Sequence, residues 1–220
     1  MLFKLALCPA FIILLYIYYR DKNEKEPIYL YSTAVVMGMF SIGIVLGLDI
    51  WLMRDLSGLK GVLYNSFVTS AFTEESVKYL FLFLITYKNP NFNTPLDSVV
   101  YTVAVSLGFA AAENLIYVLD PIIGGFKTAV SRSIFSVPAH AVFAVSMGVY
   151  YEKAVFHNQK NYFIAAFLMP FLMHGIYNVI LLSDRDKYLL VFIPYMIYLY
   201  FYGLKSIRHL KYKRLEKSGT

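Results

Sequence analysis

The chain contains seven long apolar segments, and this pattern restricts the folds open to it more than any other feature. Each segment holds roughly the 20 mostly apolar residues that a helix needs to cross the hydrocarbon core of a bilayer. The segments are Leu2 to Tyr19, Ile28 to Leu48, Gly61 to Tyr87, Ser98 to Leu119, Ser133 to Tyr151, Asn161 to Leu182 and Tyr188 to Leu204. We therefore predict an all-α fold, a polytopic transmembrane helix bundle of about seven spans, with eight as the alternative.

The composition agrees with a polytopic membrane protein, because 59% of the residues are hydrophobic and the mean hydropathy is +0.57. Cys8 is the single cysteine, which excludes a disulfide or a thiolate metal site within one chain. We predict a single transmembrane bundle over residues 1–204, with the catalytic core in 61–183. A basic cytoplasmic tail at 205–220 would follow it.

Basic residues in the connecting segments predict the orientation, because cytoplasmic loops carry the excess of Lys and Arg. With the C-terminus inside, twelve basic residues fall on the inner side and seven on the outer side. Six of the twelve lie in the tail and suit anionic lipid headgroups, so the net charge of +6 is assigned to the lipid bilayer and not to nucleic acid. We predict an integral protein of a bacterial-type plasma membrane, with its N-terminus outside.

Several ionisable residues lie inside the apolar segments, where such groups are costly and usually serve function. They are Glu74, Glu75, Lys78, Glu113, His140 and His174. In the predicted orientation Glu113 and His140 lie about 9 and 10 Å from the outer ends of their spans, and His174 lies at about 12 Å. The residues could therefore share one cavity in the outer half of the membrane.

The spacing of these residues predicts common helix faces. Ser66, Ser70, Glu74 and Lys78 follow one another at intervals of four, so they form one stripe of the third span. A polar stripe on an apolar helix points away from lipid. Gly175 removes side-chain bulk next to His174.

This set of side chains is suited to the activation of water. Glu113, His140 and His174 are suitable ligands for a divalent metal such as zinc, since a catalytic site commonly uses three protein ligands and water. Glu74 and Glu75 could then take the proton from that water, one as the base and the other orienting it. Without a metal, the same residues could activate water by general base catalysis. The residues leave both mechanisms open.

Three further residues could support the reaction. Lys78 follows Glu74 by four and Glu75 by three, so it can pair with either carboxylate on the same helix. Asn114 and Asn178 are candidate donors to a developing oxyanion, because an amide donates without competing for protons.

Four motifs in chain order resemble those of the PrsW family of intramembrane proteases. They are Thr73-Glu74-Glu75-Ser-Val-Lys78, Phe109-Ala-Ala-Ala-Glu113-Asn114, Pro138-Ala-His140 and His174-Gly175-Ile-Tyr-Asn178. The resemblance implies peptide-bond hydrolysis in a single-span membrane protein such as an anti-sigma factor, typically as the first (site-1) cut in stress signalling. It also implies Glu74 and Glu75 as catalytic residues, with the other acid and the two histidines completing the site. Whether the class is metallo or glutamic stays open.

Other functions compete with this interpretation. A CAAX-type prenyl protease is similar in layout, but its second motif carries His where this chain has Glu113. A proton-coupled transporter also uses rows of intramembrane ionisable residues, although we find no repeat and no paired broken helices typical of transporters. A membrane hydrolase of lipid amides is a further alternative.

Overall fold

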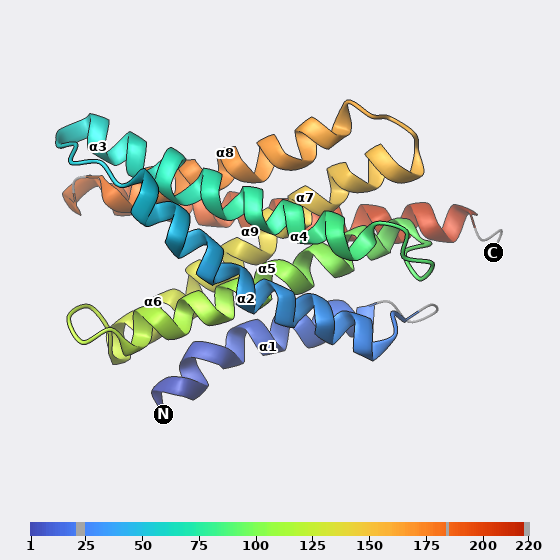
Figure 1. Cartoon of the computed structure of the whole chain (residues 1–220), viewed down its shortest axis with the longest axis horizontal. Coiled ribbons are helices and arrows are strands. Elements are labelled where there is room, and N and C mark those ends of the chain that lie inside the picture. The colour runs from blue at the N-terminus through green and yellow to red at the C-terminus, as the bar shows by residue number, and fades with distance from the viewer. Residues whose placement is uncertain (21–24, 184, 218–220) are drawn as a thin grey trace.

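The structure, a computed structural model, describes residues 1–20, 25–183 and 185–217, and these ranges contain helices and loops but no strand (Figure 1). Lys22 and the last three residues of the predicted tail lie outside the described residues, as do the side chains at 185–189 and 209–217. The helices are α1 (Leu2–Arg20), α2 (Ile28–Leu52), α3 (Gly58–Tyr64), the π-helix η1 (Asn65–Phe72), α4 (Thr73–Thr86), α5 (Pro95–Leu119), α6 (Phe126–Ile134), α7 (Ser136–Phe156), α8 (Tyr162–Leu182) and α9 (Arg185–Lys217). The predicted all-α fold is confirmed.

Six helical stretches in the described part of the chain are long and apolar enough to cross a bilayer. They are Leu2–Arg20, Ile28–Leu52, Pro95–Leu119, Phe126–Phe156, Tyr162–Leu182 and Leu190–Arg208. A seventh, continuous helical segment consists of α3, η1 and α4 and corresponds to the predicted third span. It is less apolar because it carries Glu74, Glu75 and Lys78. The bundle thus contains the seven helical segments that the hydropathy pattern predicts.

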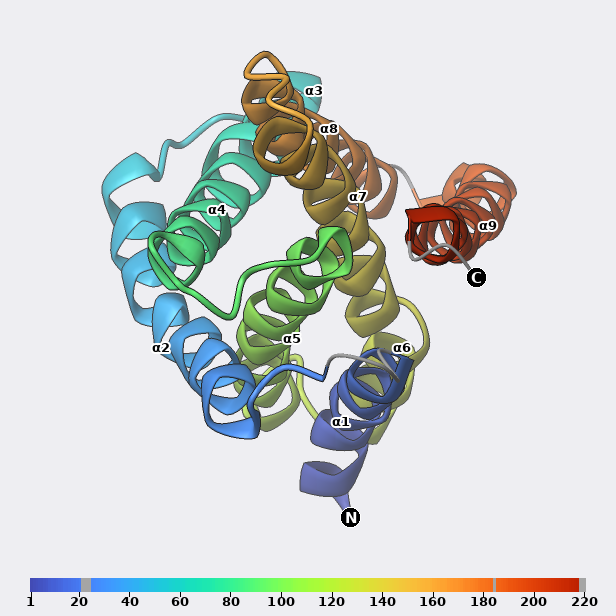
Figure 2. The same cartoon turned by 90° about the vertical axis from the view of Figure 1, so that its right-hand side faces the viewer.

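Helix α5 lies in the middle of the bundle, with α1, α2, α4 and α7 around it (Figure 2). In the most apolar stretch of α5, 78% of the residues are buried inside the bundle. The corresponding shares are 22% for α1 and 17% for α2. Helix α2 approaches α5 closely through Gly38 and Gly108, since a Cβ at either glycine would lie 2.0 Å from a carbonyl oxygen of the facing helix. Small residues permit such close helix contacts in membranes. The contact fixes the helix that carries Glu113.

The predicted fifth span differs from the structure at its start. The sequence predicts one helix from Ser133, whereas the structure has the short helix α6 followed by α7, with Phe135 between them. Pro138 has no N–H to donate to the carbonyl of Ile134, and the loss of this helical hydrogen bond favours a break at this point. The break directs α6 against α1 and brings Arg132 to the side of α5.

The predicted seventh span also differs, because the helix does not end at Leu204. Helix α9 continues to Lys217, so the predicted basic tail is, as far as the structure describes it, an extension of that helix. Figure 1 shows the C-terminal end of α9 at the same end of the bundle as the connection between α4 and α5.

That end of the bundle also buries carboxylates. The carboxylate of Asp97 accepts hydrogen bonds from the backbone N–H groups of Asn93 and Thr94 and from the Thr94 hydroxyl, which forms a capping box at the start of α5. The hydroxyl of Tyr101 donates to Glu26. These acids connect loops to α5 and satisfy backbone groups at a helix terminus.

Candidate active site

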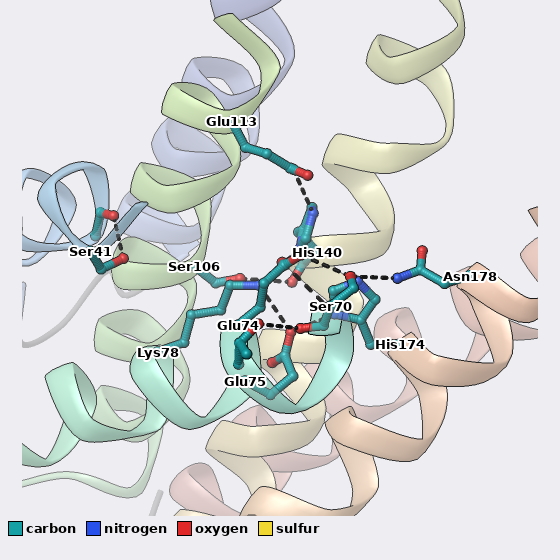
Figure 3. Close-up of polar contacts among 12 residues, drawn as sticks. Ser41, Ser70, Glu74, Glu75, Lys78, Ser106, Glu113, His140, His174 and Asn178 are labelled. Carbon is teal, nitrogen blue, oxygen red and sulfur yellow. Dashed lines mark hydrogen bonds and ion pairs between the residues drawn. The ribbon is translucent and has the colours of Figure 1, made fainter. Parts of the chain in front are cut away.

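Helices α4, α7 and α8 bring together a compact group of buried ionisable side chains (Figure 3). Lys78 Nζ lies 3.0 Å from Glu74 Oε2, 2.9 Å from Glu75 Oε1 and 3.2 Å from His140 Nδ1. His174 Nδ1 lies 2.9 Å from Glu75 Oε1. The ammonium group therefore pairs with both acids of its own helix, as the spacing of three and four predicts. This pairing offsets part of the cost of burying the two charges.

Aromatic rings fix the orientation of the group. Phe143 stacks on His174 with ring centroids 5.0 Å apart, and the two histidine rings meet edge to face at 5.3 Å. The ring of Phe109 lies 4.2 Å from Lys78 Nζ, within the range of a cation–π contact. The imidazoles of His140 and His174 are thus held by packing as well as by hydrogen bonds.

The π-helix η1 comes directly before the reactive part of α4, and π-helical turns are frequent at functional sites. The ring of Phe67 in η1 lies over Gly175 of α8, where a Cβ would come within 2.1 Å of a ring carbon. The missing side chain at Gly175 therefore lets η1 pack closely beside His174.

Glu74 has a second anchor on the side away from Lys78. The hydroxyl of Ser70 donates to Glu74 Oε1 at 3.0 Å, and Asn178 Nδ2 donates to Ser70 Oγ at 2.7 Å. Asn178, which the sequence predicts as an oxyanion donor, thus contacts Glu74 through Ser70 and also lines the cavity described below.

Glu113, a predicted metal ligand, lies on the far side of His140 from this group. Glu113 Oε2 is 3.1 Å from His140 Nε2 and 2.7 Å from Arg132 Nη2. Asn114 donates to the carbonyl of Ala6 at 2.7 Å and accepts from Arg132 Nε at 2.8 Å, so it contacts α1 and α6 and is not brought to the group. Glu113 thus extends from α5 toward His140 and Arg132, whereas Asn114 extends toward α1 and Arg132.

Four side chains of the group could hold a metal ion. One ligand atom from each of Glu74, Glu75, His140 and His174 lies within 4.8 Å of the others. Glu75 Oε2 is buried and has no hydrogen-bond partner among the described residues. Imidazole and carboxylate are donors that zinc and similar divalent ions accept. The group therefore fits a divalent metal, with the α4 carboxylates in the place that the sequence assigns to Glu113.

A cavity of about 660 Å³ lies beside the group, between α2, η1, α5, α6, α7 and α8. Of the five residues in the group, Glu74, His140 and His174 line this cavity, whereas Glu75 and Lys78 lie behind it in the described structure. A molecule in the cavity can therefore reach Glu74 directly. Glu75 is positioned to act on the site through its contacts with Lys78 and His174.

The chain matches a known protein family over most of its length. The model of a family described as PrsW family intramembrane metalloprotease matches residues 26–202. The chain belongs to the PrsW family. It is 32% identical to Protease PrsW of Geobacillus kaustophilus (strain HTA426), an alignment that covers 96% of this chain and 92% of that protein.

Other PrsW proteins match over similar lengths. Protease PrsW of Clostridioides difficile (strain 630) is 32% identical over 94% of this chain and 90% of its own length. Protease PrsW of Bacillus subtilis (strain 168) is 29% identical, with 92% of both chains covered. No solved structure matches the chain. The PrsW family membership and the spanning helices show an integral membrane protease of a metalloprotease family, which acts on membrane proteins in the bilayer.

Sequence reasoning missed Arg132 as part of the candidate site. Arg132 lies next to the start of an apolar segment and is one of the seven basic residues on the predicted outer side. Its contact with Glu113 depends on how α6 packs against α5. Asp49 was also missed, although it lines the cavity and accepts a hydrogen bond from Thr73 at 3.0 Å. An acid close to the end of an apolar segment was the available signal for Asp49.

Proposed function

We propose that this protein hydrolyses a peptide bond of a single-span membrane protein in the cavity beside α4, with Glu74 as the general base. The convergence of Glu74, His140 and His174 on one cavity wall carries the proposal. A carboxylate beside two imidazoles supplies both the base and the ligand types that peptide hydrolysis requires. We take the catalytic core to be residues 61–183, which contain all three.

We assign the metal-holding role to Glu75, His140 and His174, and zinc is the proposed ion. The unpartnered oxygen of Glu75 and the donor types of the group support this assignment. When bound, a divalent ion polarises the scissile carbonyl and activates water for attack. The sequence predicts Glu113 as a metal ligand. Its contact with His140 Nε2, on the side away from the group, instead favours a role in orienting His140.

The residues of the chain then have distinct tasks in proton transfer and positioning. Glu74 takes the proton of the attacking water and returns it to the leaving amine, while Ser70 and Lys78 hold its two oxygens in place. Lys78 also balances the charge of Glu75. Asn178 uses one N–H for Ser70, and its second N–H is available to a developing oxyanion at the cavity.

The proposed substrate is a membrane-bound anti-sigma factor, and the proposed reaction is the first cut in a stress-signalling cascade. This rests on the family resemblance and on the position of the cavity. The cavity is lined by Asp49, Met53 and Arg54 at the end of α2, at the opposite end of the bundle from the C-terminal end of α9 (Figure 1). With a cytoplasmic C-terminus and an outside N-terminus, the site lies in the outer half of the membrane. Reporter fusions at Met1 and Lys160 test this, and a cytoplasmic N-terminus would overturn it.

Cleavage of a purified single-span substrate in proteoliposomes tests the activity. We expect His174→Ala to leave a folded protein and to lower the cleavage rate by at least about 100-fold, since it removes a proposed ligand. His157→Ala, which removes a histidine at the end of α7 away from the cavity, is the matched control and should retain cleavage. Retained cleavage in His174→Ala would overturn the site. The same assay in detergent separates hydrolysis from transport, because transport requires two compartments.

Metal content tests the cofactor. Elemental analysis of the purified wild-type protein should find about one zinc ion per chain, as a catalytic site of this type holds. His140→Ala should reduce this content. An active wild-type protein without stoichiometric metal would overturn the metal assignment and favour direct general base catalysis by Glu74.

A further inference from the structure

Arg132, which belongs to none of the family motifs, is held by one turn of α5. Its Nη2 atom lies 2.7 Å from Glu113 Oε2, and its Nε atom lies 2.8 Å from Asn114 Oδ1. The guanidinium group lies 4.0 Å from the ring centroid of Tyr117. Asn114 is itself fixed by its hydrogen bond to the carbonyl of Ala6 in α1. These contacts use one edge of the guanidinium plane, formed by Nε and Nη2, and one of its faces.

This binding mode is specific to arginine. The guanidinium group is planar and presents its N–H donors in a rigid fork, whereas a lysine ammonium is a compact point charge without such a fork. Helix α6 is held in position by the hydroxyl of Ser133, which donates to the carbonyl of Leu5 at 2.8 Å. Arg132 is therefore presented to Glu113 by a helix with its own attachment to α1.

The hydrogen bonds of His140 identify the protonated nitrogen of its ring. A lysine ammonium group has donors only, so its contact with His140 Nδ1 at 3.2 Å requires a lone pair on that nitrogen. A neutral imidazole then carries its proton on Nε2, which donates to Glu113 Oε2 at 3.1 Å. Arg132 donates to the same carboxylate oxygen. The chain Arg132, Glu113, His140 thus ends in a nitrogen lone pair that faces Lys78, the cation paired with Glu74 and Glu75.

We propose that Arg132 is a positioning residue that acts through Glu113 to hold His140 with its Nδ1 lone pair directed at the reactive group. This inference rests on the proposed function for the role of His140 as a ligand. Carboxylates that accept a hydrogen bond from the second nitrogen of a ligand histidine orient the ring and fix its tautomer. Here Arg132 fixes that carboxylate in turn.

Arg132 also lines the cavity, so a direct contact with substrate is the competing explanation. The two roles differ in their kinetic consequences. A residue that positions His140 lowers kcat and metal affinity with little effect on KM. A residue that binds the substrate raises KM and leaves the metal affinity unchanged.

The first test measures kcat, KM and Zn²⁺ affinity by chelator competition for Arg132→Met and Arg132→Lys. We expect Arg132→Met to lower kcat and Zn²⁺ affinity by about 10- to 100-fold, and Arg132→Lys to restore only part of the loss. Lys127→Met is the matched control, because it removes an exposed cation from the same helix, and it should behave as the wild type. A raised KM with unchanged kcat and Zn²⁺ affinity would overturn the proposal.

A double variant tests whether Arg132 acts through Glu113. If it does, Glu113→Gln combined with Arg132→Met should lose no more kcat than Glu113→Gln alone, because the two residues belong to one chain of contacts. Fully additive losses would show that Arg132 acts independently and would overturn the proposal.

The tautomer of His140 provides a readout that needs neither activity nor metal. Nitrogen NMR of the metal-free protein with labelled histidine should show His140 protonated on Nε2 in the wild type, with the signal assigned by its loss in His140→Gln. Arg132→Met should produce a mixture of the two tautomers. If this variant does not fold, the same measurement is made on Arg132→Lys. An unchanged tautomer would overturn the proposal. A wild type that shows this tautomer but cleaves nothing would contradict the proposed function and leave the contact chain standing.

Discussion

The two ends of the bundle both bury carboxylates, but the acids at each end have different partners. At the cavity end, Glu74, Glu75 and Glu113 contact Lys78 or Arg132, and the cations hold them beside two imidazoles. At the opposite end, Asp97 accepts backbone N–H groups at the start of α5, and Glu26 accepts from Tyr101. The first arrangement gathers reactive atoms from several helices, whereas the second satisfies a helix terminus and a loop.

The difference shows why burial of an acid is a poor guide to its role. An acid that accepts hydrogen bonds from backbone N–H groups uses its oxygens to stabilise the fold. The acids of α4 have oxygens directed at other titratable groups, and one of these oxygens has no hydrogen-bond partner among the described residues. The two ends therefore predict opposite consequences of substitution, one for activity and the other for stability.

The largest effect on activity is expected for Glu74→Gln, which keeps the shape of the side chain and removes the base. The cleavage rate should fall by about 1,000-fold, within the range measured for lost general acid–base catalysis. Thermal unfolding should change little, because the amide oxygen can still accept from Lys78 while the amide N–H donates to Ser70 Oγ. A variant that retains the wild-type kcat would contradict the role of Glu74 as the base.

Gly175→Ala should have the next largest effect on activity. The added Cβ would lie 2.1 Å from a carbon of the Phe67 ring, so η1 must move relative to α8. A displacement of about 1 Å at a reactive group can cost about 100-fold in rate, and we expect a loss of this order in kcat. Adding Phe67→Leu, which vacates space at the contact, should restore part of it. Failure of this second change to help would contradict the steric explanation.

Asp97→Ala should have the smallest effect on activity and a clear effect on stability. Loss of the capping contacts should lower the free energy of unfolding by about 1 kcal/mol, the typical value for a helix cap. Cleavage per folded molecule should stay at the wild-type value, since Asp97 lies at the other end of the bundle. A lowered Tm with unchanged kcat would support a purely structural role for this end of the bundle. A large loss of kcat in folded Asp97→Ala would contradict it.

The sequence predicts the helical bundle well because hydropathy reports directly on burial in lipid. The predicted second span starts at Ile28, as α2 does, and the predicted sixth span ends at Leu182, as α8 does. Helix α6 was not predicted, because the predicted fifth span begins at Ser133 and includes only the last two residues of that helix. Lys127 and Arg132 interrupt the apolar pattern before that point. The π-helix η1 was not predicted, since hydropathy contains no information about which carbonyl a given N–H selects.

The site was predictable where residues share one helix and less so where helices meet. The interval of four predicts the Glu74–Lys78 contact at 3.0 Å, because neighbours along an α-helix are fixed by its geometry. The separation of Asn114 from the group and the attachment of Arg132 to Glu113 depend on how α1, α5 and α6 pack. No periodicity within a single segment contains that information.

The π-helix also sets the rotational phase of the residues that precede the reactive acids. In an α-helix a step of four residues overshoots a full turn by about 40°, so a row spaced by four winds around the axis. A π-helix has about 4.4 residues per turn, and the same step falls short by about 30°. The change from η1 to α4 therefore offsets the winding and keeps Ser66, Ser70, Glu74 and Lys78 near one line. Deleting one residue between Ser70 and Glu74 would rotate both serines by about a quarter of a turn relative to the acids of α4, while leaving the hydropathy almost unchanged. The length of this segment is therefore as constrained as its composition.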